Sequence, residues 1–224
     1  MADTERFWIA FGDIHEHIRH LDQIPHVEDA AGILVSGDLT NATGRPQAEH
    51  LLQSIALRNP VLHAQIGNMD TKEVDALLTE RGVNVHGKIV DLGQGICLAS
   101  VGYSTPTPFR TPSEVSEDQM IQWVRQVLVE AQNWEHVILM VHTPPHETAL
   151  DRLHSGAHVG SPGVRAMIEE FQPALVITGH IHEAQGQDQI GRSRIYNPGS
   201  FAQGGYVRIT HDSSGLRAEL RSAV

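Results

Sequence analysis

Short apolar runs alternate along the chain with segments in which apolar residues recur every three or four positions. The runs within "RFWIAFGDIH" and "AGILVSGDLT" predict strands, and a helix is expected to begin near His17. Residues 46–58 and 72–81 are typical of amphipathic helices, and the second is stopped by Gly82. Strands and helices that alternate in this way predict a largely parallel sheet covered by helices.

The middle of the chain interrupts this alternation with a β-rich segment. A hairpin is expected in "KIVDLGQGICLASVGY", with its turn at residues 93–95. The longest helix is predicted for residues 116–133, with Ser113 or Ser116 as its N-cap.

The second half resumes the alternation. A strand in "HVILMVH" leads to a loop over residues 143–161, a helix in "SPGVRAMIEEF" and a strand in "ALVITGHIH", and two or three further strands close the chain. Loops of that length are usually functional. Because no repeat or linker is found, we expect an α/β protein with one domain over residues 1–224.

Composition narrows the classes of function. With 16 Lys+Arg against 27 Asp+Glu, the formal net charge is −11, so no nucleic-acid binding is predicted. The first residues have the features of neither a signal peptide nor a membrane span, which predicts a cytoplasmic protein without membrane contact. Cys97 is the only cysteine, so it is expected to be a buried apolar residue, and a thiolate metal cage is excluded.

Polar side chains with metal-ligand chemistry follow five of the predicted strands. They are Asp13, His15, Asp38, Asn68, His142, His180 and His182. Since the carboxyl ends of parallel strands share one edge of a sheet, these side chains are expected to converge. Two pairs are spaced two apart, which on extended backbone points both members to one side. Glycine precedes four of the seven residues and is expected to let the chain turn sharply there.

The predicted donors are imidazole, carboxylate and amide groups, without sulfur. Such a mixture suits Mn, Fe, Zn, Co or Ni better than calcium. Seven donors are too many for one tetrahedral ion and fit two divalent ions that share a carboxylate. Two ions of this kind form a clamp for in-line displacement at phosphorus.

The segments "GDIH", "GDLT", "GNMD", "VH" and "GHIH" follow one another in an order that resembles the calcineurin-like metallophosphoesterases. The resemblance implies a four-layer α-β-β-α sandwich with the active site at the C-terminal ends of the strands. It also implies that Asp13, His15 and His182 hold one metal ion. Asn68, His142 and His180 would then hold the other, with Asp38 bridging the two.

The resemblance also indicates a departure from the family's pattern. Where the family's fuller motif has a histidine that protonates the leaving group, this chain has Met69, which cannot transfer a proton. The resemblance therefore places the chain in a branch without this histidine, in which Asp70 has lost the partner that it would orient. His146 and His158, in the loop after His142, are candidates for a substitute general acid, and Asp151 of the same loop could orient one of them.

The function expected from these features is hydrolysis of a small phosphoester, through in-line attack at phosphorus by a metal-bridging hydroxide. A phosphodiesterase is preferred, and a phosphomonoesterase for a small metabolite or nucleotide is the alternative. A third possibility is a scaffold that keeps the fold without catalysis. A homodimer would be compatible with exposed edge strands near the C-terminus.

Overall fold

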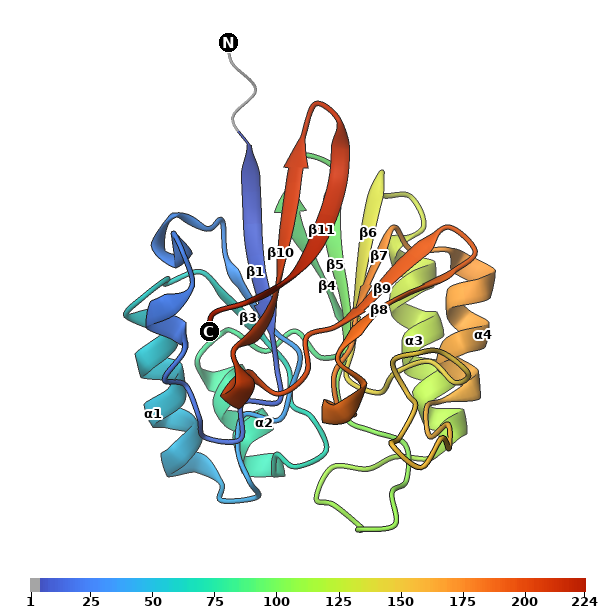
Figure 1. Ribbon diagram of the computed structural model, residues 1–224, viewed down its shortest axis with the longest axis horizontal. Coiled ribbons are helices and arrows are strands. Elements are labelled where there is room, and N and C mark those ends of the chain that lie inside the picture. The colour runs from blue at the N-terminus through green and yellow to red at the C-terminus, as the bar shows by residue number, and fades with distance from the viewer. Residues whose placement is uncertain (1–4) are drawn as a thin grey trace.

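Two β-sheets face each other in the computed structural model, which describes residues 5–224 (Figure 1). The first sheet has the spatial order β11 (Gly215–Ser222), β10 (Gly205–Asp212), β1 (Arg6–Phe11), β2 (Ile33–Val35) and β3 (Leu62–Ala64). The second has the order β4 (Lys88–Gly93), β5 (Ile96–Val101), β6 (His136–Val141), β7 (Leu175–Ile177), β9 (Ser193–Asn197) and β8 (Gly186–Ile190).

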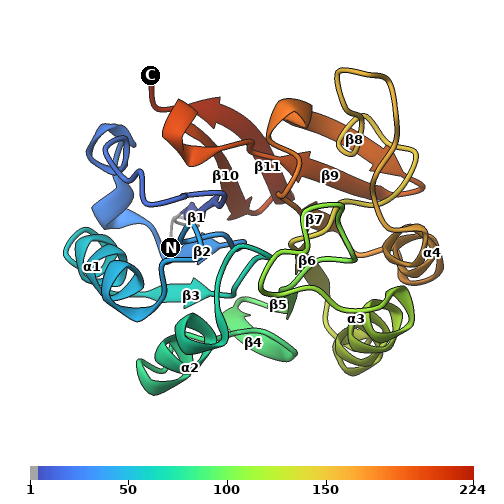
Figure 2. The same ribbon diagram turned by 90° about the horizontal axis from the view of Figure 1, so that it is seen from below.

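Four helices cover the outer faces of the two sheets. They are α1 (Arg45–Ala56), α2 (Lys72–Glu80), α3 (Glu117–Ala131) and α4 (Pro162–Phe171). Helices α1 and α2 lie on the side of the first sheet, and α3 and α4 on the side of the second (Figures 1 and 2). The four-layer α/β arrangement implied by the family resemblance is therefore confirmed.

Both sheets are mixed, which corrects the expectation of one largely parallel sheet. Strands β1, β2 and β3 are parallel, while β10 and β11 join them in antiparallel pairing. In the second sheet β5, β6, β7 and β9 are parallel, and β4 and β8 are antiparallel edge strands. A strand that is buried on both faces is an unbroken apolar run, without the alternation of apolar and polar residues that marks a sheet face open to solvent. Such runs therefore do not reveal which strands share a sheet or how many sheets they form.

Burial on both faces explains those unbroken apolar runs. In β1, Trp8 and Ala10 belong to the core between the two sheets, whereas Ile9 and Phe11 belong to the core beneath α1 and α2. A third core packs the second sheet against α3 and α4, and it contains the fully buried Cys97, as predicted. Burial raises the pKa of this thiol to about 12, so it behaves as an apolar group.

The prediction of a helix near His17 is wrong. Two short 3₁₀ turns, Leu21–Gln23 and Val27–Asp29, occupy this region instead. Pro25 lacks the N–H that a helix interior requires. The side-chain amide of Asn59 donates to the carbonyl oxygens of Val27 at 3.0 Å and Ala30 at 2.7 Å. This distant amide therefore satisfies carbonyl groups that a continuing helix would have used.

Of the two serines predicted as N-cap candidates for the longest helix, Ser116 has this role in α3. Its side chain accepts a hydrogen bond from the backbone N–H of Gln119, whereas Ser113 donates to the carbonyl oxygen of Asp70. Strand β8 was not predicted, because "GQDQI" is a polar edge strand without an apolar run. Among residues 5–224, no helix is both long and apolar enough to cross a membrane.

Candidate metal centre

The ends of five strands meet at one edge of the two sheets. Asp13 follows β1, Asp38 follows β2 and Asn68 follows β3, and these are neighbouring strands of the first sheet. His142 follows β6 and His180 follows β7, which are neighbours in the second sheet. These parallel strands run downward in Figure 1, so that Figure 2 views the molecule from the end where they finish. The expected convergence is therefore observed.

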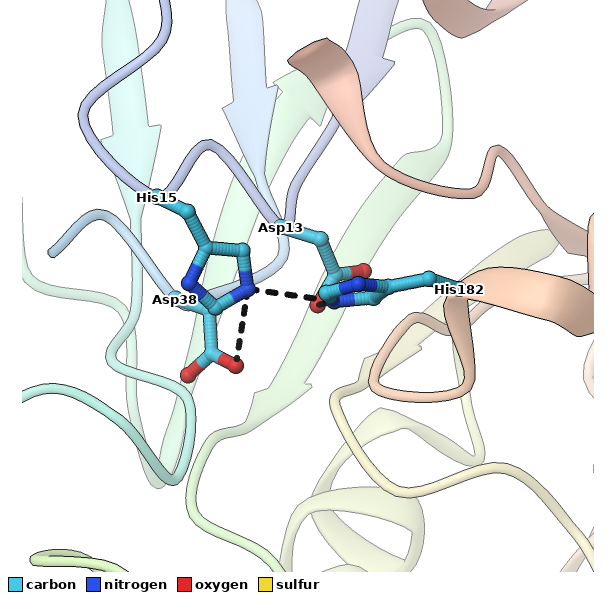
Figure 3. A group of neighbouring side chains, drawn as sticks. All are labelled: Asp13, His15, Asp38 and His182. Carbon is cyan, nitrogen blue, oxygen red and sulfur yellow. Dashed lines mark hydrogen bonds and ion pairs between the residues drawn. The ribbon is translucent and has the colours of Figure 1, made fainter. Parts of the chain in front are cut away.

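A first cluster contains Asp13, His15, Asp38 and His182 (Figure 3). One ligand atom from each of these residues lies within 4.8 Å of the corresponding atom of every other. His15 Nε2 is 3.1 Å from His182 Nε2, and Asp13 Oδ1 is 3.2 Å from His182 Nε2. Two imidazole nitrogens and two carboxylates that point at one another in this way can hold a divalent cation.

A second cluster contains Asp38, His142 and His180, again with ligand atoms within 4.8 Å of one another. Asn68 adds a fourth donor, since its Oδ1 lies 3.0 Å from His142 Nε2 and 2.7 Å from His180 Nδ1. The amide nitrogen of Asn68 donates to the hydroxyl of Thr111 at 3.1 Å, which turns Oδ1 toward the two histidines. This cluster therefore also offers only nitrogen and oxygen donors.

Asp38 belongs to both clusters. Its Oδ2 lies 3.6 Å from His15 Nε2 and 3.4 Å from His142 Nε2, between the two groups. Its Oδ1 accepts a hydrogen bond of 2.7 Å from the backbone N–H of Met69. The carboxylate is thus fixed through one oxygen while the other is available to both clusters, which is the geometry that a shared ligand requires.

Hydrogen bonds to the far side of two imidazole rings orient them toward the clusters. His142 Nδ1 donates to the carbonyl oxygen of Ser36 at 3.0 Å, and His15 Nδ1 donates to Oδ1 of Asn41 at 2.8 Å. In each ring Nε2 is the nitrogen that faces the cluster. Such outer partners are usual for metal-binding histidines, because they fix the tautomer and the ring orientation.

The buried charges of the clusters favour a cation. Burial raises the pKa of Asp38, but the positive charge of His142 and the hydrogen bonds to the carboxylate more than offset this and lower the pKa to about 2. Burial lowers the pKa of His142, and the charge of Asp38 more than offsets this, raising it to about 9. Burial and the nearby His142 lower the pKa of His180 to about 4. Asp38 is therefore ionised and His180 neutral at neutral pH, the forms in which these groups bind metals, whereas His142 is protonated in the metal-free protein and would release its proton on binding an ion.

Left-handed backbone places several of these side chains, which corrects the expectation of extended residue pairs. The φ angle is 48° at Asp13, 45° at His15, 51° at Asp38 and 69° at His180. Such angles are uncommon for residues with a side chain and concentrate at functional sites. The strand ends therefore turn at the polar residues themselves.

The preceding glycines mostly provide space. Gly37 has a φ of 122° and fulfils the expected turning role, but Gly67 lies outside the left-handed region. A Cβ atom on Gly67 would lie 2.1 Å from Asp38 Oδ1 and 2.6 Å from His142 Cε1. A side chain at this position would therefore displace residues of both clusters.

Asp70 has a role that the sequence did not reveal. Its carboxylate accepts hydrogen bonds from the backbone N–H groups of Leu39, Thr40 and Gly67, at 3.0, 2.8 and 3.1 Å. Burial, and secondly the charge of Asp38, raises the pKa of Asp70 to about 7. Asp70 thus ties the turn after β2 to the turn after β3, although no histidine stands at position 69 for it to orient.

The candidate acids His146 and His158 are not part of either cluster. Both lie in the long loop after β6, where their Nδ1 atoms are 3.4 and 2.7 Å from the buried carboxylate of Asp151. The sequence predicted their place in this loop and Asp151 as a residue that could orient one of them, and both rings contact this carboxylate. Sequence reasoning missed Ser36 and Asn41, since nothing in their local sequence marks them as partners of distant histidines.

The comparisons with known proteins agree with this architecture. The family described as metallophosphoesterase, calcineurin superfamily, matches residues 117–217. The chain is also 32% identical over 176 residues to the uncharacterized protein MJ1162 of Methanocaldococcus jannaschii, with 76% of this chain and 78% of that protein covered. The chain belongs to the calcineurin superfamily of metallophosphoesterases.

Solved structures show the same fold at low sequence identity. The protein TT1561 of Thermus thermophilus aligns with a TM-score of 0.71 and 19% identity, covering 99% of this chain and 100% of that one. A dimetal phosphatase from Danio rerio aligns with a TM-score of 0.68 and 11% identity, covering 98% and 96%. The Asp and His clusters described above are consistent with a dimetal site of the kind that the name of the second protein states.

Proposed function

We propose that this protein is a dinuclear metal-dependent phosphoester hydrolase whose preferred substrates are small phosphodiesters. The observation that carries the proposal is the position of Asp38 Oδ2 between two clusters of nitrogen and oxygen donors. A site for a single ion would not need a shared carboxylate. A scaffold without catalysis would have no need for seven converging donors.

The donor set fits two divalent ions of the Mn, Fe, Zn, Co or Ni type. Asp13, His15 and His182 would hold one ion and Asn68, His142 and His180 the other, with Asp38 shared. When bound, two such ions supply a hydroxide at neutral pH and neutralise the oxygens of the phosphoryl group. Ser36 and Asn41 contribute by holding the rings of His142 and His15 in place.

The charge of the protein favours a diester as the substrate. The formal charge of −11 opposes the approach of a monoester dianion more strongly than that of a singly charged diester. Met69 cannot donate a proton, so position 69 supplies no general acid for the leaving group. A phosphomonoesterase acting on a small metabolite or nucleotide is the alternative.

Hydrolysis of bis(4-nitrophenyl) phosphate and 4-nitrophenyl phosphate by the Mn²⁺-loaded protein tests the proposal. We expect a higher kcat/KM for the diester, and we expect chelation by EDTA to reduce its hydrolysis by at least ~10²-fold because the ions carry the charge stabilisation. Restoration by added Mn²⁺ is the control. A higher kcat/KM for the monoester would favour the phosphomonoesterase, and no metal-dependent turnover of either ester would favour the scaffold.

A further inference from the structure

A buried carboxylate organises the long loop between β6 and α4. Asp151 is fully buried, and its two oxygens accept hydrogen bonds from the backbone N–H groups of Glu147, Thr148 and Gly160, at 3.2, 2.9 and 2.9 Å. Burial raises the pKa of this carboxyl, but the bond from His158 and those backbone bonds more than offset the effect and bring it below its ordinary value. Asp151 is therefore a fixed negative charge at neutral pH.

Two imidazole rings share this carboxylate unequally. His158 Nδ1 donates to Asp151 Oδ1 at 2.7 Å. His146 Nδ1 lies 3.4 Å from Asp151 Oδ2, and within residues 5–224 it makes no hydrogen bond. The side chain of His158 is 34% exposed while Asp151 is buried beneath it. With Nδ1 occupied by the carboxylate, Nε2 of His158 is the nitrogen that can exchange a proton with a ligand.

The loop that carries these rings is anchored beside two of the three histidine-bearing segments of the candidate metal centre, those that follow β6 and β7. It starts directly after His142, and its base is closed by a bond of 2.9 Å from the N–H of Ser161 to the carbonyl oxygen of Pro144. Its outer part is tied to the turn after β7, because the backbone N–H of His154 donates to Glu183 at 2.9 Å. Glu183 adjoins His182. In Figure 1 this gold loop lies in the lower part of the molecule, toward which the parallel strands run.

We propose that His158 is the general acid that protonates the leaving group, in place of a residue at position 69, and that Asp151 is its positioning residue. This inference rests on the proposed function. As hydroxide attacks phosphorus, the bond from phosphorus to the leaving oxygen breaks and its electron pair stays on that oxygen. The proton on Nε2 of His158 moves to this oxygen, so that the alcohol departs neutral. His158 then regains a proton from solvent, and Asp151 stabilises the imidazolium that results.

The substitution His158→Asn tests this role without emptying the loop. The amide nitrogen of asparagine can replace Nδ1 as the donor to Asp151, but the variant has no group equivalent to Nε2. We expect kcat/KM for methyl phenyl phosphate to fall by about 10²-fold, because phenol is a poor leaving group. For methyl 4-nitrophenyl phosphate, whose leaving group needs little protonation, we expect a loss of less than about threefold.

Two matched variants control the experiment. His26 and Asp29 form an exposed His–Asp pair outside this loop, with His26 Nδ1 3.2 Å from the carboxylate. The substitution His26→Asn should change the hydrolysis of neither substrate. His146→Asn should have a smaller effect on the phenyl ester than His158→Asn, because His146 lacks the hydrogen bond that positions His158. A larger effect of His146→Asn would overturn the assignment to His158.

Nitrogen NMR of the metal-free protein provides a readout that does not depend on turnover. We expect neutral His158 to carry its proton on Nδ1, since that nitrogen donates to Asp151. A proton on Nε2 of the neutral ring would contradict the proposed orientation. Equal losses for both esters in His158→Asn, with an active wild type, would overturn this inference alone. A wild type that hydrolyses neither ester would contradict the proposed function itself.

Discussion

Replacing Asp38 with asparagine is expected to lower the metal content from about two ions per chain to one or fewer and to reduce phosphodiester hydrolysis by about 10³-fold. The reason is that Oδ2 of Asp38 faces both clusters, so that its replacement by an amide nitrogen removes a charge and a donor from each. Elemental analysis after dialysis and kcat/KM for bis(4-nitrophenyl) phosphate measure the two effects.

The fold should survive this substitution. The remaining oxygen of the asparagine can still accept the hydrogen bond from the N–H of Met69, which Oδ1 of Asp38 accepts in the native chain. Asp29→Asn is a matched control at an exposed carboxylate and should leave metal content and turnover unchanged. Two ions per chain and native activity in the Asp38 variant would show that this carboxylate is not the shared ligand.

Replacing Asp70 with alanine is expected to destabilise the metal-free protein by about 3 kcal/mol. The substitution leaves the backbone N–H groups of Leu39, Thr40 and Gly67 without their acceptor in a buried place, and each unsatisfied donor costs about 1–3 kcal/mol. Removal of the repulsion between Asp70 and Asp38 offsets part of this loss. Urea denaturation followed by circular dichroism measures the change in the free energy of unfolding.

An exposed carboxylate again provides the comparison for this variant. Asp29→Ala should change the free energy of unfolding by no more than about 0.5 kcal/mol, as is usual for surface substitutions. A loss below about 1 kcal/mol in Asp70→Ala would mean that the two turns hold their positions without the carboxylate. The hydrogen bonds of Asp70 would then be a consequence of the fold instead of a support for the metal centre.

The sequence predicted where the candidate ligands lie because their position follows from two general properties of α/β proteins. Parallel strands share a C-terminal edge, and a buried strand is recognisable from its apolar run. Asp13, Asp38 and His142 each lie within three residues of the end of such a run, so their convergence could be expected without knowing how the sheets pack. Most helices were predicted for a similar reason, since their apolar spacing is local.

The remaining features depend on contacts between residues far apart in the chain. The hydrogen bonds from Asn59 to Val27 and Ala30 lie where a helix was predicted and 3₁₀ turns are found, and no local pattern indicates them. Asp70 was interpreted through the residue beside it, whereas two of its three backbone partners, Leu39 and Thr40, lie 31 and 30 positions away in the turn after β2. The left-handed backbone at the ligands was likewise not predicted: Asp and His adopt it more often than most residues, but whether they do so depends on how the strand ends pack.

A crystal structure of the protein grown with Mn²⁺, with anomalous scattering recorded at the manganese edge, would locate the ions without reference to turnover. We predict two peaks about 3.5–4 Å apart, with Asp38 contacting both ions. Asp13, His15 and His182 should surround one ion, and Asn68, His142 and His180 the other. A single peak, or two peaks that Asp38 does not join, would contradict a dinuclear centre built on this shared carboxylate.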